Sequence, residues 1–157
     1  MKVRLLVIGK TVPSFMAEGV TEYTTRIGRY CNFEYEVLPD VKRPAVLSPQ
    51  KLSDLEAEVF LKRIKSNDFV ILLDEHGILQ GSEEMAHQIM QWMNSGAVNP
   101  TFIIGGSYGF GKSIRERSNA VWSMSPMTFS HQLARLVFTE QLYRCFTIVK
   151  GEPYHHK

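Results

Sequence analysis

The sequence lacks several features that would assign it to a special class of protein. Its two cysteines, Cys31 and Cys145, are too few for a disulfide framework and do not have the spacing of metal ligands. No apolar run approaches the roughly 18 residues of a membrane-spanning helix, so we expect no membrane partner. The apolar run near the N-terminus stops at Gly9 without a small-residue cleavage site, which favours a strand over a secretion signal. Together these absences predict a cytoplasmic protein.

A strong excess of charge of either sign is also missing, because the formal net charge is only +2. The 157 residues are 44% hydrophobic and 22% charged, ordinary values for a globular chain, and we expect one domain over residues 1–157. From residue 110 onward seven basic residues stand against three acidic ones. This local excess is compatible with a phosphate-rich partner, although a solvated face would have the same composition.

The hydrophobic pattern alternates between segments of strand length and segments of helix length. Apolar runs predict strands over Val3–Ile8, Phe33–Leu38, Phe69–Leu73, Thr101–Ile104 and Ala120–Met124. Helical spacing predicts helices over Phe15–Ile27, Lys51–Ile64, Ser82–Asn94, Ser113–Arg117 and Ser130–Ile148. Because helices that connect strands in this way join parallel neighbours, the sequence predicts an α/β fold: three layers around a five-stranded, mostly parallel sheet.

A glycine-rich stretch, GSYGFGKS at residues 106–113, matches the phosphate-binding pattern G-x-x-x-x-G-K-[ST]. In triphosphatases of that class the acidic strand that assists magnesium binding follows the phosphate loop. Here VILLDE at residues 70–75 precedes the loop, and no apolar run ending in Asp comes after it. A nucleotide triphosphatase is therefore an alternative, but the glycines are explained more simply by close approach of the main chain to a flat or extended ligand.

Ligands of open α/β sheets bind beyond the carboxyl ends of the strands, which directs attention to three predicted loops. These are DEHG after the third strand, GGSYGFGKS after the fourth and SPMTFSH after the fifth. Asp74, Glu75 and His76 are adjacent on one turn and rarely converge on one ion in that arrangement, so no metal site is predicted. Trp92 and Trp122 are expected in the core rather than as base-stacking platforms.

Three strings in the C-terminal half resemble one enzyme family. They are IIGGSYG, SMSPMTFSHQLARLVFTEQLYR and the ending GEPYHHK, and the opening KVRLLVIGK and the segment LLDEHG extend the likeness to nearly the whole chain. In combination they resemble the ribosomal large-subunit pseudouridine N3-methyltransferases of the SPOUT class. The resemblance implies a deep trefoil knot in the C-terminal half, and a homodimer whose active sites draw on both subunits. It also implies methylation of 23S ribosomal RNA within the assembled ribosome.

The resemblance further implies that S-adenosylmethionine binds in the knot. The expected contacts are Leu73, Gly105, Met124, Ser125, Pro126, Met127, Thr128 and Phe129. The apolar members of this set suit adenine and a methionine tail, and main-chain groups would supply donors and acceptors. Many relatives carry proline where Ser130 stands, but a serine there can cap the following helix. On this interpretation the match at Lys112 and Ser113 is a coincidence.

Methylation of an imide nitrogen requires loss of its proton, which a general base or stabilisation of the anion assists. The candidate groups are His131, Arg135, Tyr154 and His155. His131 could instead be a helix-start histidine bonded to the main chain, and Arg135 could form a surface salt bridge, although we favour contact with phosphate or the developing anion. Tyr154 and His155 lie in a terminal segment that has little reason to be ordered without a partner or substrate. A frayed end, or a non-catalytic RNA-binding module of the same fold, are the alternatives.

Overall fold

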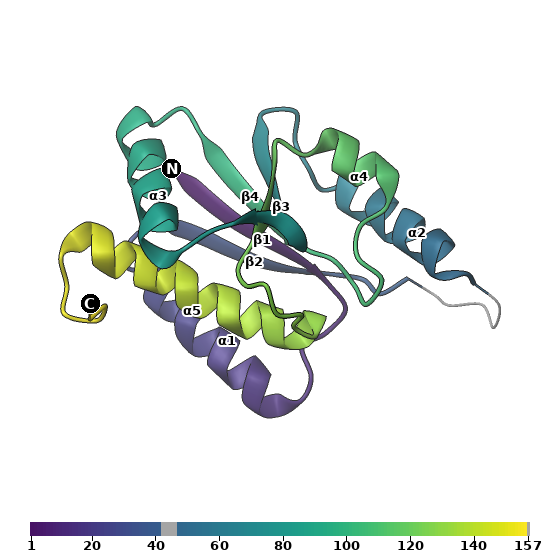
Figure 1. The fold of residues 1–157 in the computed structure, drawn as a ribbon, viewed down its shortest axis with the longest axis horizontal. Coiled ribbons are helices and arrows are strands. Elements are labelled where there is room, and N and C mark those ends of the chain that lie inside the picture. Colours follow the sequence, from purple (N-terminus) through teal and green to yellow (C-terminus); the bar gives the residue numbers. More distant parts are fainter. Residues whose placement is uncertain (42–46, 157) are drawn as a thin grey trace.

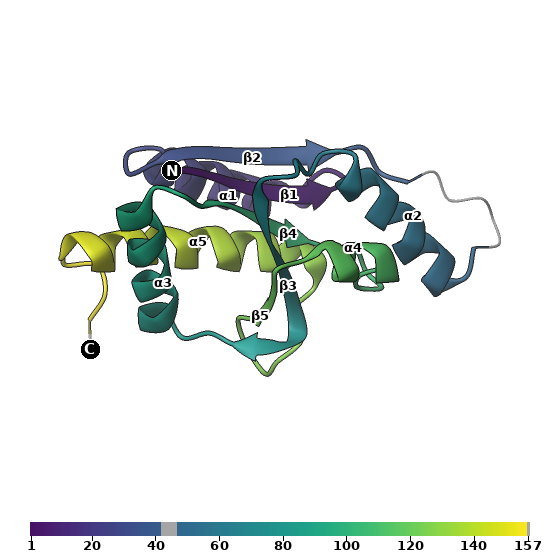
Figure 2. The ribbon, with the colours of Figure 1, turned by 90° about the horizontal axis from the view of Figure 1, so that it is seen from above.

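A five-stranded sheet lies at the centre of the computed structural model, which describes residues 1–41 and 47–156 (Figure 1). The strands are β1 (Lys2–Ile8), β2 (Asn32–Leu38), β3 (Asp68–Leu79), β4 (Asn99–Ile104) and β5 (Ala120–Ser123). Their spatial order is β2-β1-β4-β3-β5, and the pairings between these strands are all parallel. The predicted parallel sheet is therefore confirmed, and β3 lies at a steep angle to β1 and β2 in Figure 2, as sheet twist requires.

Helices cover both faces of this sheet. They are α1 (Ser14–Ile27), α2 (Pro49–Leu61), α3 (Ser82–Ser95), α4 (Lys112–Arg117) and α5 (His131–Lys150). Figure 1 shows α1, α3 and α5 together on one side, and α2 beside α4 on the other. The predicted three layers are thereby confirmed. Within residues 1–41 and 47–156, no helix combines the length and the apolar character that a membrane crossing requires.

Each face of the sheet has its own apolar core. Side chains of β1 alternate between the two, because Leu5 faces the cluster under α1, α3 and α5, whereas Leu6 faces the cluster under α2 and α4. In the first cluster the rings of Trp92 and Trp122 stack with their centroids 5.7 Å apart. Both tryptophans are buried, so the prediction that they belong to the core is confirmed.

Strand β3 is longer than the sequence predicts. The predicted strand stopped at Leu73 and DEHG was expected to be a loop, but β3 continues to Leu79. Its pairing with β5 shifts register between Leu73 and Ile78, so the segment is an irregular strand. Gly77 explains the close approach, because a Cβ there would lie 2.7 Å from main-chain atoms of β5. The loop prediction for DEHG was wrong because Asp74, Glu75 and His76 interrupt the apolar pattern although they lie within β3.

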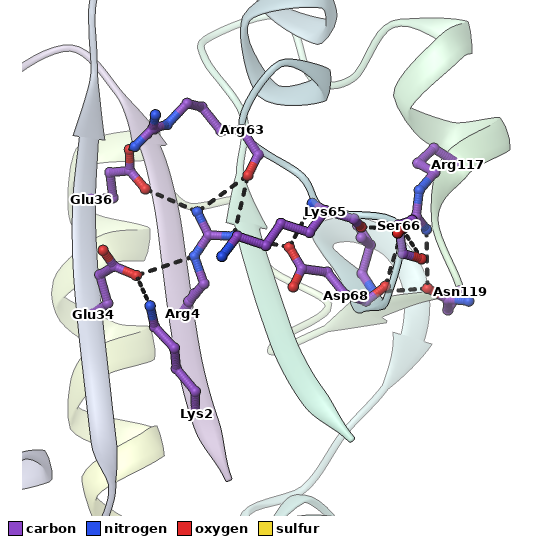
Figure 3. Close-up of polar contacts among 11 residues, drawn as sticks. Lys2, Arg4, Glu34, Glu36, Arg63, Lys65, Ser66, Asp68, Arg117 and Asn119 are labelled. Atoms are coloured by element: carbon purple, nitrogen blue, oxygen red, sulfur yellow. Dashed lines mark hydrogen bonds and ion pairs between the residues drawn. The ribbon is translucent and has the colours of Figure 1, made fainter. Parts of the chain in front are cut away.

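A charged network near the start of β1 joins three strands (Figure 3). The buried guanidinium of Arg4 donates to Asp68 on β3 at 2.9 Å and to Glu36 on β2 at 3.0 Å, and it also reaches the main-chain oxygen of Arg63. A buried charge is tolerated only when such partners are present. Arg117 adds bonds from α4 to main-chain oxygens at the beginning of β3. This network fixes how β1, β2, β3 and α4 sit together at the amino-terminal end of the sheet.

Candidate functional site

The carboxyl ends of β3, β4 and β5 surround a cleft of about 580 Å³, which we call the first cleft. Its lining includes seven of the eight residues predicted to bind a cofactor: Leu73, Gly105, Met124, Ser125, Met127, Thr128 and Phe129. Pro126 belongs to the same loop but does not line the cleft. Segments from the middle and the end of the chain thus meet where an open α/β sheet places its ligands.

The glycine loop after β4 is shaped by a carboxylate of the protein itself. The main-chain N–H of Gly106 donates to Glu56 of α2 at 3.2 Å, and Glu56 is buried. A Cβ at Gly106 would lie 2.4 Å from that carboxylate, so a side chain there would have to displace Glu56 from its bond to the loop. At Gly105 a Cβ would lie 3.1 Å from the main-chain oxygen of Gly109, whose φ of +72° also favours glycine.

This geometry is unlike that of a phosphate loop. In a phosphate loop the amides converge on an anion and the lysine reaches the phosphates, whereas here the Gly106 amide is bonded to a carboxylate. Lys112 does not line the first cleft; its side chain is 85% exposed and lies 3.6 Å from Glu116 on the same helix. The coincidental interpretation of the sequence match is therefore favoured.

The loop after β5 is held by its own hydroxyl groups. The Ser123 hydroxyl donates to the main-chain oxygen of Ser125 at 2.9 Å, and the Ser125 side chain accepts from the N–H of Met127 at 2.9 Å. The Ser130 side chain accepts from the N–H of Leu133 at 3.2 Å and so caps α5, which confirms the predicted cap. The loop thus presents Met124 and Phe129 to the first cleft in a defined conformation.

Two adjacent acids of β3 hold the walls of the first cleft. Asp74 accepts from Arg115 of α4 and from the N–H of His76, whereas Glu75 accepts from the hydroxyl of Thr128. Burial alone would raise the pKa of Asp74, but the hydrogen bonds from His76 and Arg115 hold it below its ordinary value. These acids were expected in a loop beside the ligand site and not as metal ligands, and no part in holding the cleft was predicted for them. Their position at a strand end was the signal that they line the cleft.

His131 is the predicted catalytic residue that the structure places at the first cleft. It begins α5, and its Nδ1 lies 3.4 Å from the Ser107 hydroxyl of the glycine loop. Its Nε2 lies 3.4 Å from the side-chain amide nitrogen of Gln132. The ring therefore stands between the glycine loop and the helix start, within reach of a ligand in the cleft.

Arg135 is placed differently from either interpretation of the sequence. Its side chain is buried, and its guanidinium donates to the main-chain oxygens of Ile8 and Gly9 and to the hydroxyl of Thr11. Burial lowers the pKa of Arg135 below its ordinary value. A surface salt bridge is contradicted by this burial, and direct contact with phosphate does not fit a guanidinium that is bonded to the main chain inside the protein. Arg135 instead anchors the turn after β1.

The terminal residues Tyr154 and His155 fold back onto α5. The Tyr154 hydroxyl donates to Glu140 at 3.0 Å, and the guanidinium of Arg144 lies 4.8 Å from the Tyr154 ring centroid. The ring of His155 lies 3.5 Å from Arg144 and 3.6 Å from Glu83. Burial, followed by hydrogen bonds with neighbouring side chains, raises the pKa of Tyr154. The frayed-end alternative is wrong, and so is the argument that only a partner or substrate would order this segment.

This packing keeps the terminal segment away from the first cleft of the same chain. Glu140, which Tyr154 contacts, lies nine residues after His131 on α5, or about 14 Å along the helix axis. Figure 1 shows the C-terminus beside the far end of α5, opposite the end that begins next to the cleft. The structure thus brings His131 to the cofactor residues but not Tyr154 or His155. Lys157 lies outside the described residues.

Comparisons with known proteins agree with this arrangement. A family model described as "Predicted SPOUT methyltransferase" matches residues 1–155. The chain is 43% identical to proteins named "Ribosomal RNA large subunit methyltransferase H" from Christiangramia forsetii and from Porphyromonas gingivalis, in each case over 157 residues and 100% of both chains. A solved structure of a probable methyltransferase from Bordetella pertussis Tohama I has a TM-score of 0.56 at 11% identity, covering 92% of this chain and 95% of that one. At that identity the likeness concerns the fold alone.

Proposed function

The chain belongs to the SPOUT methyltransferase family, and we propose that it methylates N3 of a pseudouridine in 23S ribosomal RNA with S-adenosylmethionine as the donor. The observation that carries this proposal is the first cleft, where seven of the eight residues expected to bind the cofactor line one cavity. The names of the full-length relatives support large-subunit ribosomal RNA as the substrate. The compartment that contains ribosomes is accordingly the expected location.

The lining of the first cleft suits this cofactor. Its volume of about 580 Å³ lies within the range of small-molecule sites. Leu73, Met124 and Phe129 provide apolar walls for adenine and the methionine tail, and the main chain of the glycine loop provides polar groups. When bound, the cofactor supplies a methyl group on a sulfonium, whose carbon–sulfur bond breaks as the bond to N3 forms. Pro126 lies between Ser125 and Met127 in the same loop but does not itself line the cleft.

We infer that His131 is the general base that removes the proton from N3. A general base must lie within hydrogen-bond reach of the proton that it removes, and His131 is the predicted base that lines the first cleft. Arg135 acts as a positioning residue, because its bonds to the main chain of β1 hold the start of α5, and with it His131, in place.

A homodimer would give Tyr154 and His155 a part in the same reaction. In one chain these residues lie about 14 Å or more along α5 from His131, so they could serve a cleft only in a second copy. The arrangement fits the resemblance, which implies active sites that draw on both subunits. Light scattering coupled to gel filtration tests the dimer, and a monomer at assay concentration contradicts it.

The trefoil knot is part of the same proposal. In the sheet β3 lies between β4 and β5, so the chain crosses β3 on its way from β4 to β5. After β5 the chain turns back, and α5 packs against α1 and α3. This return across the carboxyl end of β3 is compatible with a chain end that threads through a loop, a path that almost all proteins avoid. A crystal structure in which α5 does not pass through the preceding loops would contradict it.

The decisive experiment is transfer of a labelled methyl group to ribosomes that lack the modification, followed by mass mapping of the labelled nucleotide. Thermal shift provides the parallel test, because a ligand that binds only the native state raises the melting temperature. We expect stabilisation by S-adenosylmethionine and its demethylated product. Stabilisation by ATP with magnesium alone would favour a triphosphatase, and cofactor or ribosome binding without transfer would indicate a non-catalytic module.

A further inference from the structure

A second cleft of about 740 Å³ adjoins the first. It lies beyond the carboxyl ends of β1 and β2 and is lined by residues of the β1–α1 turn, the end of β2, α2 and the start of α5. Gly106 and His131 line both clefts. The two cavities therefore meet at the catalytic histidine, and neither the sequence pattern nor the family comparison assigns a role to the second one.

The rim of this second cleft is held rigidly by the first turns of α5. The Gln132 side chain accepts from the N–H of Val12 at 3.1 Å and donates to the main-chain oxygen of Lys10 at 3.1 Å. Arg135 donates to the oxygens of Ile8 and Gly9 just before them. The oxygen and the nitrogen of the Gln132 amide, and both terminal nitrogens of the Arg135 guanidinium, thus form hydrogen bonds with the turn after β1. Such fixed polar groups reduce the ordering cost of binding a ligand.

The lining of the second cleft has the character of a site for a flat polar ring. Val12 and Val37 are 61% and 43% exposed, respectively, although both are aliphatic and both line the cavity. Lys10 and Asp40 add a cation and an anion at the rim. Exposed aliphatic side chains beside the charged groups of Lys10 and Asp40 suit a heterocycle with an apolar face and a polar edge.

An enzyme that modifies a base within folded RNA must take that base out of its stack and hold it in a pocket. The first cleft cannot serve this purpose when the cofactor fills it. The acceptor site must therefore adjoin the first cleft where proton transfer occurs, and the second cleft shares Gly106 and His131 with it.

We propose that the second cleft holds the extruded uracil-type base of the acceptor nucleotide, with its N3 edge toward His131. This inference rests on the proposed function. Val12 and Val37 contact the faces of the ring, and Lys10 pairs with the phosphate of the same nucleotide. The N3 proton passes to His131, and N3 faces the methyl group held in the first cleft.

The test fills the second cleft without touching the first. Val12→Trp and Val37→Trp place a large ring in the cavity at exposed positions, where folding tolerates the change. Met90→Trp, at an exposed position on α3 that lines neither cleft, is the matched control. The measurements are kcat/KM for methyl transfer to unmodified ribosomes, cofactor affinity by calorimetry and the melting temperature.

We expect each cleft-filling variant to lose at least about 100-fold in kcat/KM while cofactor affinity stays within about twofold, and the control to match the unaltered enzyme. Methyl transfer within about twofold of the unaltered enzyme in both variants overturns the inference. So does a parallel loss of cofactor affinity, because the cavity would then belong to the cofactor site. Methyl transfer by the unaltered enzyme is measured before any variant is compared. If the unaltered enzyme does not methylate ribosomes, the proposed function itself is contradicted.

Discussion

The hydroxyl of Thr128 donates a hydrogen bond to Glu75, joining the loop before α5 to strand β3 at the mouth of the first cleft. The neighbouring acid, Asp74, holds Arg115 of α4 in the same way. Adjacent strand residues point to opposite faces, so two consecutive acids reach two different walls. The part of β3 that the apolar pattern failed to include therefore joins two segments that line the first cleft, α4 and the loop before α5.

Removing the tie to Thr128 should loosen the cofactor loop. We expect Glu75→Ala to weaken cofactor binding by about 1 kcal/mol, or roughly fivefold, because one hydrogen bond to a charged acceptor is lost. Glu75→Gln keeps an acceptor for the Thr128 hydroxyl and should retain most of the affinity. Calorimetry with the demethylated cofactor measures both, and equal losses in the two variants would contradict the role of the bond.

Gly105→Val should crowd the first cleft. The added Cβ would lie 3.1 Å from the main-chain oxygen of Gly109 and 3.2 Å from the Phe110 ring, and the branched side chain would extend further. We expect cofactor affinity to fall at least about tenfold, a cost of roughly 1.4 kcal/mol. Calorimetry on protein with an unchanged melting temperature checks this. Undiminished affinity would remove the glycine loop from the cofactor site.

His155→Ala should lower methyl transfer at saturating cofactor and leave cofactor affinity nearly unchanged. Cofactor affinity should be unaffected because His155 contacts Arg144 and Glu83 and does not line the first cleft of its own chain. We expect kcat to fall by about 100-fold, the lower end of the range for a group that assists proton transfer. His156→Ala is the matched control because His156 is exposed. Full activity of the His155 variant would refute the catalytic role of the tail.

Arg4→Met should destabilise the fold strongly. Asp68 and Arg4 are both buried, and removal of one partner leaves the other charge unpaired, which typically costs about 3 to 5 kcal/mol. The double variant Arg4→Met, Asp68→Leu should recover much of that loss. Urea denaturation measures each. The exposed pair of Lys112 and Glu116 supplies the control, because Lys112→Met should change stability by less than about 1 kcal/mol.

The Asp74 carboxyl should make the free energy of unfolding depend on pH, with lower stability in acid. Its pKa in the folded protein lies below the ordinary value of 3.8, so its contribution is fully present above that value. As the pH falls through the lower folded pKa, the carboxyl is protonated and the contribution disappears. We expect Asp74→Asn to be less stable than the unaltered protein at pH 7, with a difference that shrinks toward pH 2. A difference that grows in acid would contradict this sign.

Much of the fold was predictable because it follows from hydrophobic spacing. Runs such as FVILL and FII pack into the cores on both faces of the sheet, and the predicted helix over Ser130–Ile148 contributes Phe146 to the core. The Ser130 cap was predictable as well, since capping depends on one residue type at one position. The end of β3 was not, because a strand that carries acids and pairs irregularly has no periodic signature.

The candidate site was predictable only where a local motif carries it. The residues expected to bind the cofactor lie in the strings LLDEHG, IIGGSYG and SMSPMTFSHQLARLVFTEQLYR, and seven of those eight residues line the first cleft. The burial of Arg135 could not be foreseen, since its partners at Ile8 and Gly9 are more than a hundred residues away and are main-chain atoms without a sequence signature. The second cleft escaped prediction for a related reason: its lining comes from five segments that lie far apart in the sequence, and no single motif marks them as one cavity.

The hydrogen bonds from Arg135 and Gln132 to the turn after β1 join the first strand of the chain to its last helix. During synthesis the first strand emerges early, whereas the helix that completes the second cleft emerges last. A nascent chain therefore completes the second cleft only once α5 has left the ribosome and packed against the turn after β1.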